Sequence, residues 1–270
     1  MATSPTPVVF IHGLWLHSTS WQPWVELFRD HGYDPIAPEW PGIPGTVAEA
    51  RAHPEKIPGH GVKKVADHFA GIIQSLPARP VVIGHSFGGL LAQNLLGRDL
   101  AAAAVAIDPA PIKGVLALPV SSLRVASVAL RNPANLKRAV GLTEKEWRYG
   151  FTNTLPEEES QELYDKWMIP TPGRPLFEAA LANFTFSADA PTKVNVANAD
   201  RGPLLVTSGG EDHTVPPAVC RGTVRQYRGS KAVTELREFP GKGHSLILDH
   251  GWREVADATL AWLTERLKSP

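Results

Sequence analysis

The chain has 270 residues, 43% of them hydrophobic, and its 27 acidic side chains balance 27 lysines and arginines. This composition suits an α/β domain with a large core, and it provides no basic stripe or acidic tail for binding nucleic acid or a membrane surface. The one cysteine, Cys220, excludes an intrachain disulfide. Residues 1–7 lack a signal pattern and no apolar run is long enough to span a bilayer, so we expect a cytoplasmic protein.

The first part of the chain alternates short apolar runs with amphipathic stretches. Residues 8–11 predict a strand buried on both faces, as in a parallel sheet. We expect a helix at 21–31, a second strand at 33–37 and a second helix at 62–76. Residues 38–61 form a proline-rich loop that leaves the carboxyl end of a strand, the edge at which α/β sheets bind ligands.

A nucleophile elbow is predicted around Ser86. The apolar residues 81–83 run into the sequence GHSFG at 84–88, and a helical pattern begins at once. This order of strand, sharp turn and helix strains the serine backbone and raises its hydroxyl above the carboxyl edge of the sheet. The alternative is a glycine-rich turn with an incidental serine, which this context makes the weaker interpretation. A fourth strand follows at 103–107 and ends at Asp108.

The alternation stops between residues 113 and 200. Helical patterns without a clear strand predict a cap inserted over the sheet edge, and residues 1–112 and 201–270 then form the core domain. Most of the aromatic residues of this cap are expected to pack within it, with one or two facing a pocket. The predicted cap helices are 121–131, 133–140, 144–149, 157–167 and 176–183.

Two further strands are predicted at 203–207 and 233–239, each followed by a polar loop, and a last helix at 252–267. Three side chains therefore follow three different strands in the order Ser86, Asp212 and His244. Histidine can take the proton of a serine hydroxyl, because its pKa lies near neutrality. A carboxylate holds the imidazole in the required tautomer, so the set predicts a catalytic triad.

Four motifs carry a resemblance to a known family. They are HG at 12–13, GHSFGG at 84–89, GGEDHTVP at 209–216 and GKGH at 241–244. With them the chain resembles the serine hydrolases of the α/β-hydrolase superfamily. The resemblance implies a sheet of about six mostly parallel strands flanked by helices, with a helical cap. It also implies an oxyanion hole made by the amides of Leu14 and Phe87, and we assign Trp15 and His85 to the substrate pocket.

The start of the chain resembles one branch of this superfamily, the plant methylesterases and hydroxynitrile lyases. Most other members have a strand hairpin before the HG strand, whereas here that strand begins almost at the first residue. The lyases have a small polar residue beside the oxyanion hole, where this chain has Trp15 and Leu16, and Ser245 stands where a lysine would be expected. These differences count against cyanohydrin cleavage.

The triad acid has two candidates, because Asp108 also follows a strand and some related lipases take their acid from that position. We prefer Asp212, because the pattern GxxDxxV at 209–215 matches the commoner acid loop, and Asp108 before a proline is typical of a turn. No group of histidine, cysteine and acidic residues has metal-ligand spacing, so we expect neither a metal nor another cofactor.

The residues together predict a serine esterase that cleaves a small apolar carboxylic ester or lactone through an acyl-enzyme on Ser86. A serine at the elbow separates the chain from the dehalogenases and epoxide hydrolases of this fold, which have aspartate there. A perhydrolase resembling the haloperoxidases, or a C–C bond hydrolase, would use the same triad. A ligand-binding receptor is the alternative of another class. The sequence leaves open whether the protein is a monomer or a homodimer.

Overall fold

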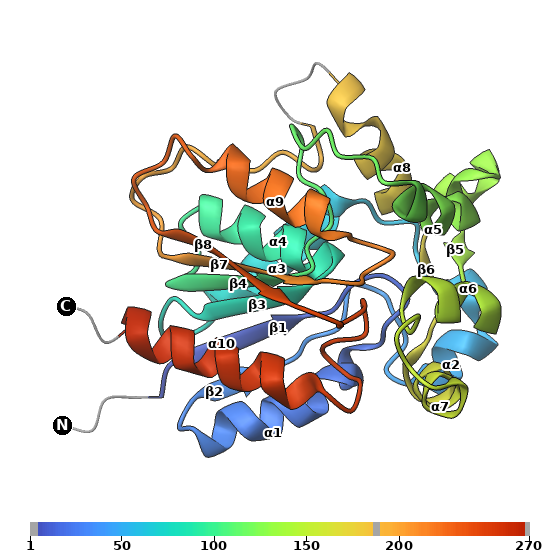
Figure 1. Cartoon of the computed structure of the whole chain (residues 1–270), viewed down its shortest axis with the longest axis horizontal. Helices are drawn as coiled ribbons and strands as arrows, with labels where there is room; N and C mark the ends of the chain where they lie inside the picture. Colours follow the sequence, from blue (N-terminus) through green and yellow to red (C-terminus); the bar gives the residue numbers. More distant parts are fainter. Residues whose placement is uncertain (1–4, 186–189, 268–270) are drawn as a thin grey trace.

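A computed structural model describes residues 5–185 and 190–267 (Figure 1). Its centre is a six-stranded sheet, and every strand pair in it is parallel. The α/β-hydrolase fold predicted from the sequence is thereby confirmed, with strand order β2-β1-β3-β4-β7-β8. The strands are β1 (Pro7–Ile11), β2 (Asp34–Ile36), β3 (Val81–His85), β4 (Ala103–Ile107), β7 (Leu204–Gly209) and β8 (Thr234–Phe239).

The central strands consist almost entirely of apolar residues, because helices cover both faces of the sheet. Every residue of β1, β3, β4 and β7 is buried. The edge strand β8 is different, because it exposes Arg237 and Glu238, and charged residues discourage pairing with another chain.

Helices α1 and α10 cover one face of the sheet, and α3, α4 and α9 cover the other (Figure 1). Trp24 of α1 and Trp252 of α10 hold the first pair together, with ring centroids 6.1 Å apart. None of the described helices is long and apolar enough to span a bilayer. The flanking helices are α1 (Gln22–Asp30), α3 (Val62–Gln74), α4 (Phe87–Gly97), α9 (Pro217–Gln226) and α10 (Trp252–Leu267).

The segment between β4 and β7 is mainly helical and lies beside the carboxyl edge of the sheet (Figure 1). Its division from the core as a separate cap remains a prediction. Its elements are α5 (Val120–Leu130), η3 (Pro133–Lys137), β5 (Ala139–Val140), α6 (Glu144–Gly150), α7 (Glu157–Trp167), β6 (Thr171–Pro172), α8 (Arg174–Leu181) and η4 (Ala182–Phe184).

One element of this segment differs from the sequence prediction. The expected helix over 133–140 is a 3-10 turn that ends at Lys137, and β5 then pairs with β6 in an antiparallel ribbon. The Gly173 amide donates to the carbonyl of Arg138, which ties the two strands together. Pairing with a segment more than 30 residues away therefore overrides a local helical pattern.

The carboxyl edge of the sheet collects every loop that carries a predicted site residue. These loops follow β1, β3, β4, β7 and β8. Among the described non-glycine residues, four have a positive φ, and three of them (Trp15, Ser86 and Asp108) lie at this edge. Strained backbone of this kind persists where the surrounding structure enforces it, often at functional sites.

Candidate active site

Ser86 occupies the sharp turn between β3 and α4 with φ 56° and ψ −119°. Glycine is required at two neighbouring positions, because a Cβ on Gly84 would collide with the carbonyl of Gly88, and one on Gly88 would collide with the carbonyl of Ile11. These close approaches hold the turn in the geometry expected of a nucleophile elbow. The Ser86 side chain is largely buried and lines a cavity at this edge of the sheet.

His244 and Asp212 form the tightest polar contact at this edge. The His244 Nδ1–H donates to Asp212 Oδ2 at 2.5 Å, and both side chains are buried. The other oxygen of Asp212 accepts hydrogen bonds from the amides of Thr214 and Val215 at 2.6 and 2.8 Å. Burial opposes ionisation of Asp212, but His244 and these hydrogen bonds outweigh it and lower the pKa of Asp212. An ionised Asp212 can therefore hold the imidazole with Nδ1 protonated.

The Nε2 atom of His244 is buried and hydrogen-bonds to no described residue. This nitrogen is the one that would take a proton from Ser86, but no hydrogen bond joins the two side chains among the described residues. Such bonds are often long or poorly aligned in resting hydrolases and tighten with substrate. The structure thus contains the hydrogen bond between Asp212 and His244, but no hydrogen bond between His244 and Ser86 among the described residues.

His85 lies behind His244 rather than in the cavity wall. It is fully buried, its Nε2–H donates to the His244 carbonyl at 2.9 Å, and the two ring centroids are 4.5 Å apart. Burial, followed by the charge of His244, lowers the pKa of His85 well below its usual value, so the ring is neutral. Phe151 packs edge-on against the His244 ring at 4.8 Å. His85 and Phe151 therefore fix the imidazole, and His85 is not among the residues that line the cavity.

The predicted oxyanion residues, Leu14 and Phe87, both belong to backbone segments next to Ser86. Phe87 begins α4, so its amide belongs to the unpaired amides at a helix N-terminus. A Cβ on Gly13 would be 2.7 Å from the Cβ of Ser86, so the loop that carries Leu14 passes directly against the serine. No described residue accepts a hydrogen bond from the amide of Leu14 or Phe87. Both amides are thus available to an oxyanion.

The cavity beside Ser86 measures about 120 Å³ and has an aliphatic wall. Trp15, which the sequence analysis assigns to the pocket, lines it together with Phe87, and the Trp15 indole donates a 3.0 Å hydrogen bond to the carbonyl of Val140. The other apolar lining residues are Ala110, Pro111, Ala117, Leu118, Leu123, Val125, Ala126, Leu130, Leu176, Ala179, Ala180, Val215 and Val219.

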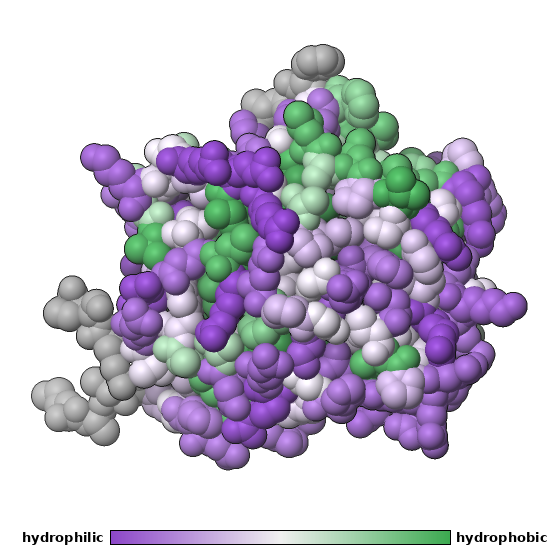
Figure 2. All heavy atoms as spheres, viewed as in Figure 1, coloured by the Kyte–Doolittle hydropathy of each residue, from purple (hydrophilic) through white to green (hydrophobic). Residues whose placement is uncertain are grey.

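None of the described aromatic residues of the inserted segment lines this cavity, so the expectation that one or two of them face the pocket is wrong for these residues, and Phe186 lies outside the described part of the chain. Trp147 and Phe151 instead stack on each other at 4.4 Å and are fully buried in the interior. Leu118 and Leu123 line the cavity yet are 67% and 48% exposed, and Figure 2 shows apolar surface over this part of the molecule. The wall that would face a substrate is therefore aliphatic and reaches the molecular surface.

A sequence profile for the alpha/beta hydrolase family matches residues 8–258. The chain belongs to the alpha/beta hydrolase family. Solved structures share its fold, among them a monoacylglycerol lipase from Paleococcus ferrophilus, with 24% identity, a TM-score of 0.69, and coverage of 97% of this chain and 96% of that chain. An esterase from Thermogutta terrifontis has 22% identity, a TM-score of 0.67, and coverage of 98% and 91%. An Arabidopsis methylesterase has 14% identity, a TM-score of 0.65, and coverage of 96% and 99%. No curated protein matches the chain.

The loop that carries Leu14 in this alpha/beta hydrolase is held by a partly buried acid, Glu39, that sequence reasoning missed. Glu39 pairs with His12 through one oxygen, and its other oxygen lies 3.3 Å from His17 Nε2 and accepts from the Ser18 amide at 2.9 Å. Burial raises the pKa of Glu39, but the two histidines outweigh it and lower this pKa to about 2. The only sequence signal was the position of Glu39 in the long loop after β2.

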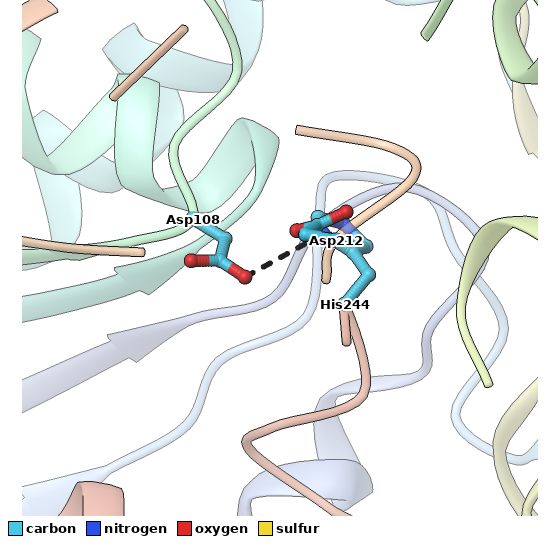
Figure 3. Close-up of side chains that lie close together, drawn as sticks. All are labelled: Asp108, Asp212 and His244. Carbon is cyan, nitrogen blue, oxygen red and sulfur yellow. Dashed lines mark hydrogen bonds and ion pairs between the residues drawn. The ribbon is translucent and has the colours of Figure 1, made fainter. Parts of the chain in front are cut away.

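Asp108, the rival acid, lies close to the same histidine (Figure 3). Its Oδ2 is 4.0 Å from His244 Nδ1, compared with 2.5 Å for Asp212. Its Oδ1 accepts from the Gly209 amide at 2.8 Å. The geometry thus favours Asp212 as the hydrogen-bonding partner of His244. Asp108 lies next to these two residues without a hydrogen bond to His244.

Asp108, Asp212 and His244 could also be considered as metal ligands, because their ligand atoms lie within 4.8 Å of one another. The 2.5 Å between His244 Nδ1 and Asp212 Oδ2 does not fit such a site. Two ligands that bind a tetrahedral zinc at about 2.0–2.2 Å stand about 3.3 Å or more apart. The spacing fits a hydrogen-bonded acid–histidine pair instead.

Proposed function

We propose that this alpha/beta hydrolase cleaves a carboxylic ester of a small apolar acid through an acyl-enzyme on Ser86. The observation that carries the proposal is the position of Ser86 on a strained elbow in an aliphatic cavity, at the sheet edge that holds the 2.5 Å pair of His244 and Asp212. A hydroxyl at such a turn becomes a nucleophile when a base accepts its proton.

The reaction follows from the position of each group. The Ser86 oxygen attacks the ester carbonyl while His244 Nε2 takes its proton, and Asp212 stabilises the imidazolium. The amides of Leu14 and Phe87 bind the oxyanion. His244 returns the proton to the leaving alcohol, the ester C–O bond breaks, and the acyl group stays on Ser86. Water activated by His244 then releases the acid and restores the serine.

The comparisons support ester substrates, because the similar solved structures include proteins named as a lipase, an esterase and a methylesterase. The cavity supports an apolar acyl group, since its wall offers many aliphatic carbons and few polar atoms apart from Ser86, Ser122 and Thr214. Its volume of about 120 Å³ supports short acyl chains over long ones.

Hydrolysis of p-nitrophenyl esters from acetate to dodecanoate tests this proposal, with wild type and Ser86→Ala compared at equal concentrations. We expect turnover of the short-chain esters, and a mass increase of one acyl group on the wild type that is missing from Ser86→Ala. Full activity of Ser86→Ala would overturn the proposal. Peracid formation from acetate and peroxide at a rate far above ester hydrolysis would support a perhydrolase instead.

A further inference from the structure

Asp108 is a buried carboxyl without an assigned role. Its side chain has no exposed surface, and its backbone has φ 41°, which aspartate tolerates better than most residues. Oδ1 accepts one hydrogen bond, from the Gly209 amide. Oδ2 accepts none from the described residues and points toward Asp212 and His244 (Figure 3). A turn residue would not need a buried oxygen directed at the active-site histidine.

Two carboxyl groups therefore share one buried space on the Nδ1 side of His244. Their ligand atoms and that of His244 lie within 4.8 Å of one another. Two negative charges this close and buried from solvent repel strongly, so one carboxyl keeps its proton. Asp212 accepts two amide bonds and the imidazole bond, whereas Asp108 accepts one amide bond. The negative charge consequently belongs on Asp212.

We propose that Asp108 is a positioning residue of the active site, which shares one proton and one negative charge with Asp212 and donates a hydrogen bond to it from Oδ2. This inference rests on the proposed function, in which Asp212 orients His244. Donation from Asp108 would hold the Asp212 carboxylate against His244. When the charge of Asp212 is removed by substitution, Asp108 would carry the negative charge beside His244 instead.

The groups around the pair agree with this assignment. Burial, followed by the charge of Asp212, raises the pKa of Asp108 well above its usual value. His85 faces the site from the end of β3 and is neutral. Cys220 of α9 is also buried, and burial raises the pKa of its thiol well above the usual value, so it is neutral as well. Neither of these two neighbours is a cation that would neutralise a second carboxylate.

The first test compares two substitutions of Asp108 by the kcat/KM of p-nitrophenyl acetate between pH 5 and 9. Asp108→Asn keeps a hydrogen-bond donor and should stay within about threefold of wild type. Asp108→Gly accepts the positive φ but loses the donor, and kcat/KM should fall by about tenfold or more, the size of one hydrogen bond to a charged group. Asp99→Gly is the matched control, because Asp99 also has a positive φ but is exposed. Equal losses in the two Asp108 variants would overturn the donor role.

The second test removes the Asp212 charge. In a serine protease triad, replacing the aspartate by asparagine lowers kcat about 10⁴-fold. Here the single variant Asp212→Asn should keep a kcat/KM at least tenfold higher than that of the double variant, which carries both Asp108→Asn and Asp212→Asn. The residual kcat/KM of the single variant should rise with pH as Asp108 ionises. Equal activity of the single and double variants would show that Asp108 does not carry the charge.

A readout without substrate separates this inference from the proposed function. The downfield proton resonance of His244 Nδ1, recorded in the Ser86→Ala background, should be retained with Asp108→Asn and shifted with Asp108→Gly. An identical resonance in both variants would contradict the shared pair whatever the activity. Absence of ester turnover by the wild type, together with the expected resonance pattern, would overturn the proposed function alone.

Discussion

The two sides of the candidate active site are built from opposite kinds of residue. The sheet edge brings together buried polar groups (Ser86, Asp108, Asp212 and His244), and each is fixed by a strained turn or by hydrogen bonds. The inserted segment supplies aliphatic side chains from α5 and α8. The side chains at the sheet edge can hold and transfer protons, whereas the aliphatic side chains of the inserted segment can only make van der Waals contacts with a substrate. Changes on the sheet side should therefore affect the chemical step, and changes on the other side should affect which substrate is used.

The largest effect is expected at the nucleophile. In subtilisin, removing the serine lowers kcat about 10⁶-fold, and Ser86→Ala should approach that loss with short-chain esters. Steady-state rates measure the loss, and thermal unfolding should show little change, because only one hydroxyl is removed. A variant within tenfold of wild type would place the nucleophile elsewhere.

Gly13→Ala tests whether the oxyanion loop must press against Ser86. The added methyl group would lie 2.7 Å from the Ser86 Cβ, so the loop or the serine must shift. Loss of one oxyanion donor costs roughly 10²–10³ in kcat, and we expect a loss of that order with a smaller change in KM. Gly45→Ala serves as a control, because nothing lies within 4 Å of its added carbon. An unchanged kcat would separate this loop from the chemistry.

Glu39→Gln should affect stability in a pH-dependent way. The pKa of Glu39 falls from 4.5 to about 2 on folding, which corresponds to at most about 3 kcal/mol of stabilisation. A lowered pKa stabilises the fold above the unfolded value, and this contribution disappears as the pH falls from 4.5 to about 2. Urea unfolding at pH 7 should therefore show a destabilised variant, and the difference should shrink near pH 3.

The control for this prediction is Glu55→Gln, which removes an exposed carboxylate beside His53. Its free energy of unfolding should change far less than that of Glu39→Gln. Equal destabilisation by Glu39→Gln at pH 7 and pH 3 would mean that the effect comes from packing rather than from charge.

The smallest effect is expected in the aliphatic wall. Ala179→Leu on α8 adds carbon atoms to the cavity and should reduce kcat/KM for hexanoate esters about tenfold relative to acetate esters. The acetate rate of the same variant is the internal control, because the catalytic groups are unchanged. A uniform loss on both esters would show that this wall also positions the chemistry.

The sequence was sufficient where local pattern determines structure. Short apolar runs predict the central strands, and the glycines around Ser86 indicate the elbow from neighbouring residues alone. Helix α7 begins and ends at the predicted residues. In each case the deciding residues lie within a few positions of one another.

The sequence alone does not predict the contacts that join distant segments of the chain. The sequence analysis assigns His85 to the pocket, but its side chain donates to the carbonyl of His244, 159 positions away, and does not line the cavity. Glu39 meets His12 from 27 positions away. Asp108 and Asp212 both follow strands, and the sequence favours Asp212 only through the pattern of its loop, whereas their distances to His244 Nδ1, 4.0 and 2.5 Å, separate them directly.

The most direct test of the central claim is intact-protein mass spectrometry after rapid quenching with p-nitrophenyl butyrate. We expect a transient increase of one butyryl group on the wild type, mapped to the peptide that contains Ser86, and no increase on Ser86→Ala. A butyryl group on another residue, or turnover without any covalent intermediate on Ser86, would contradict it.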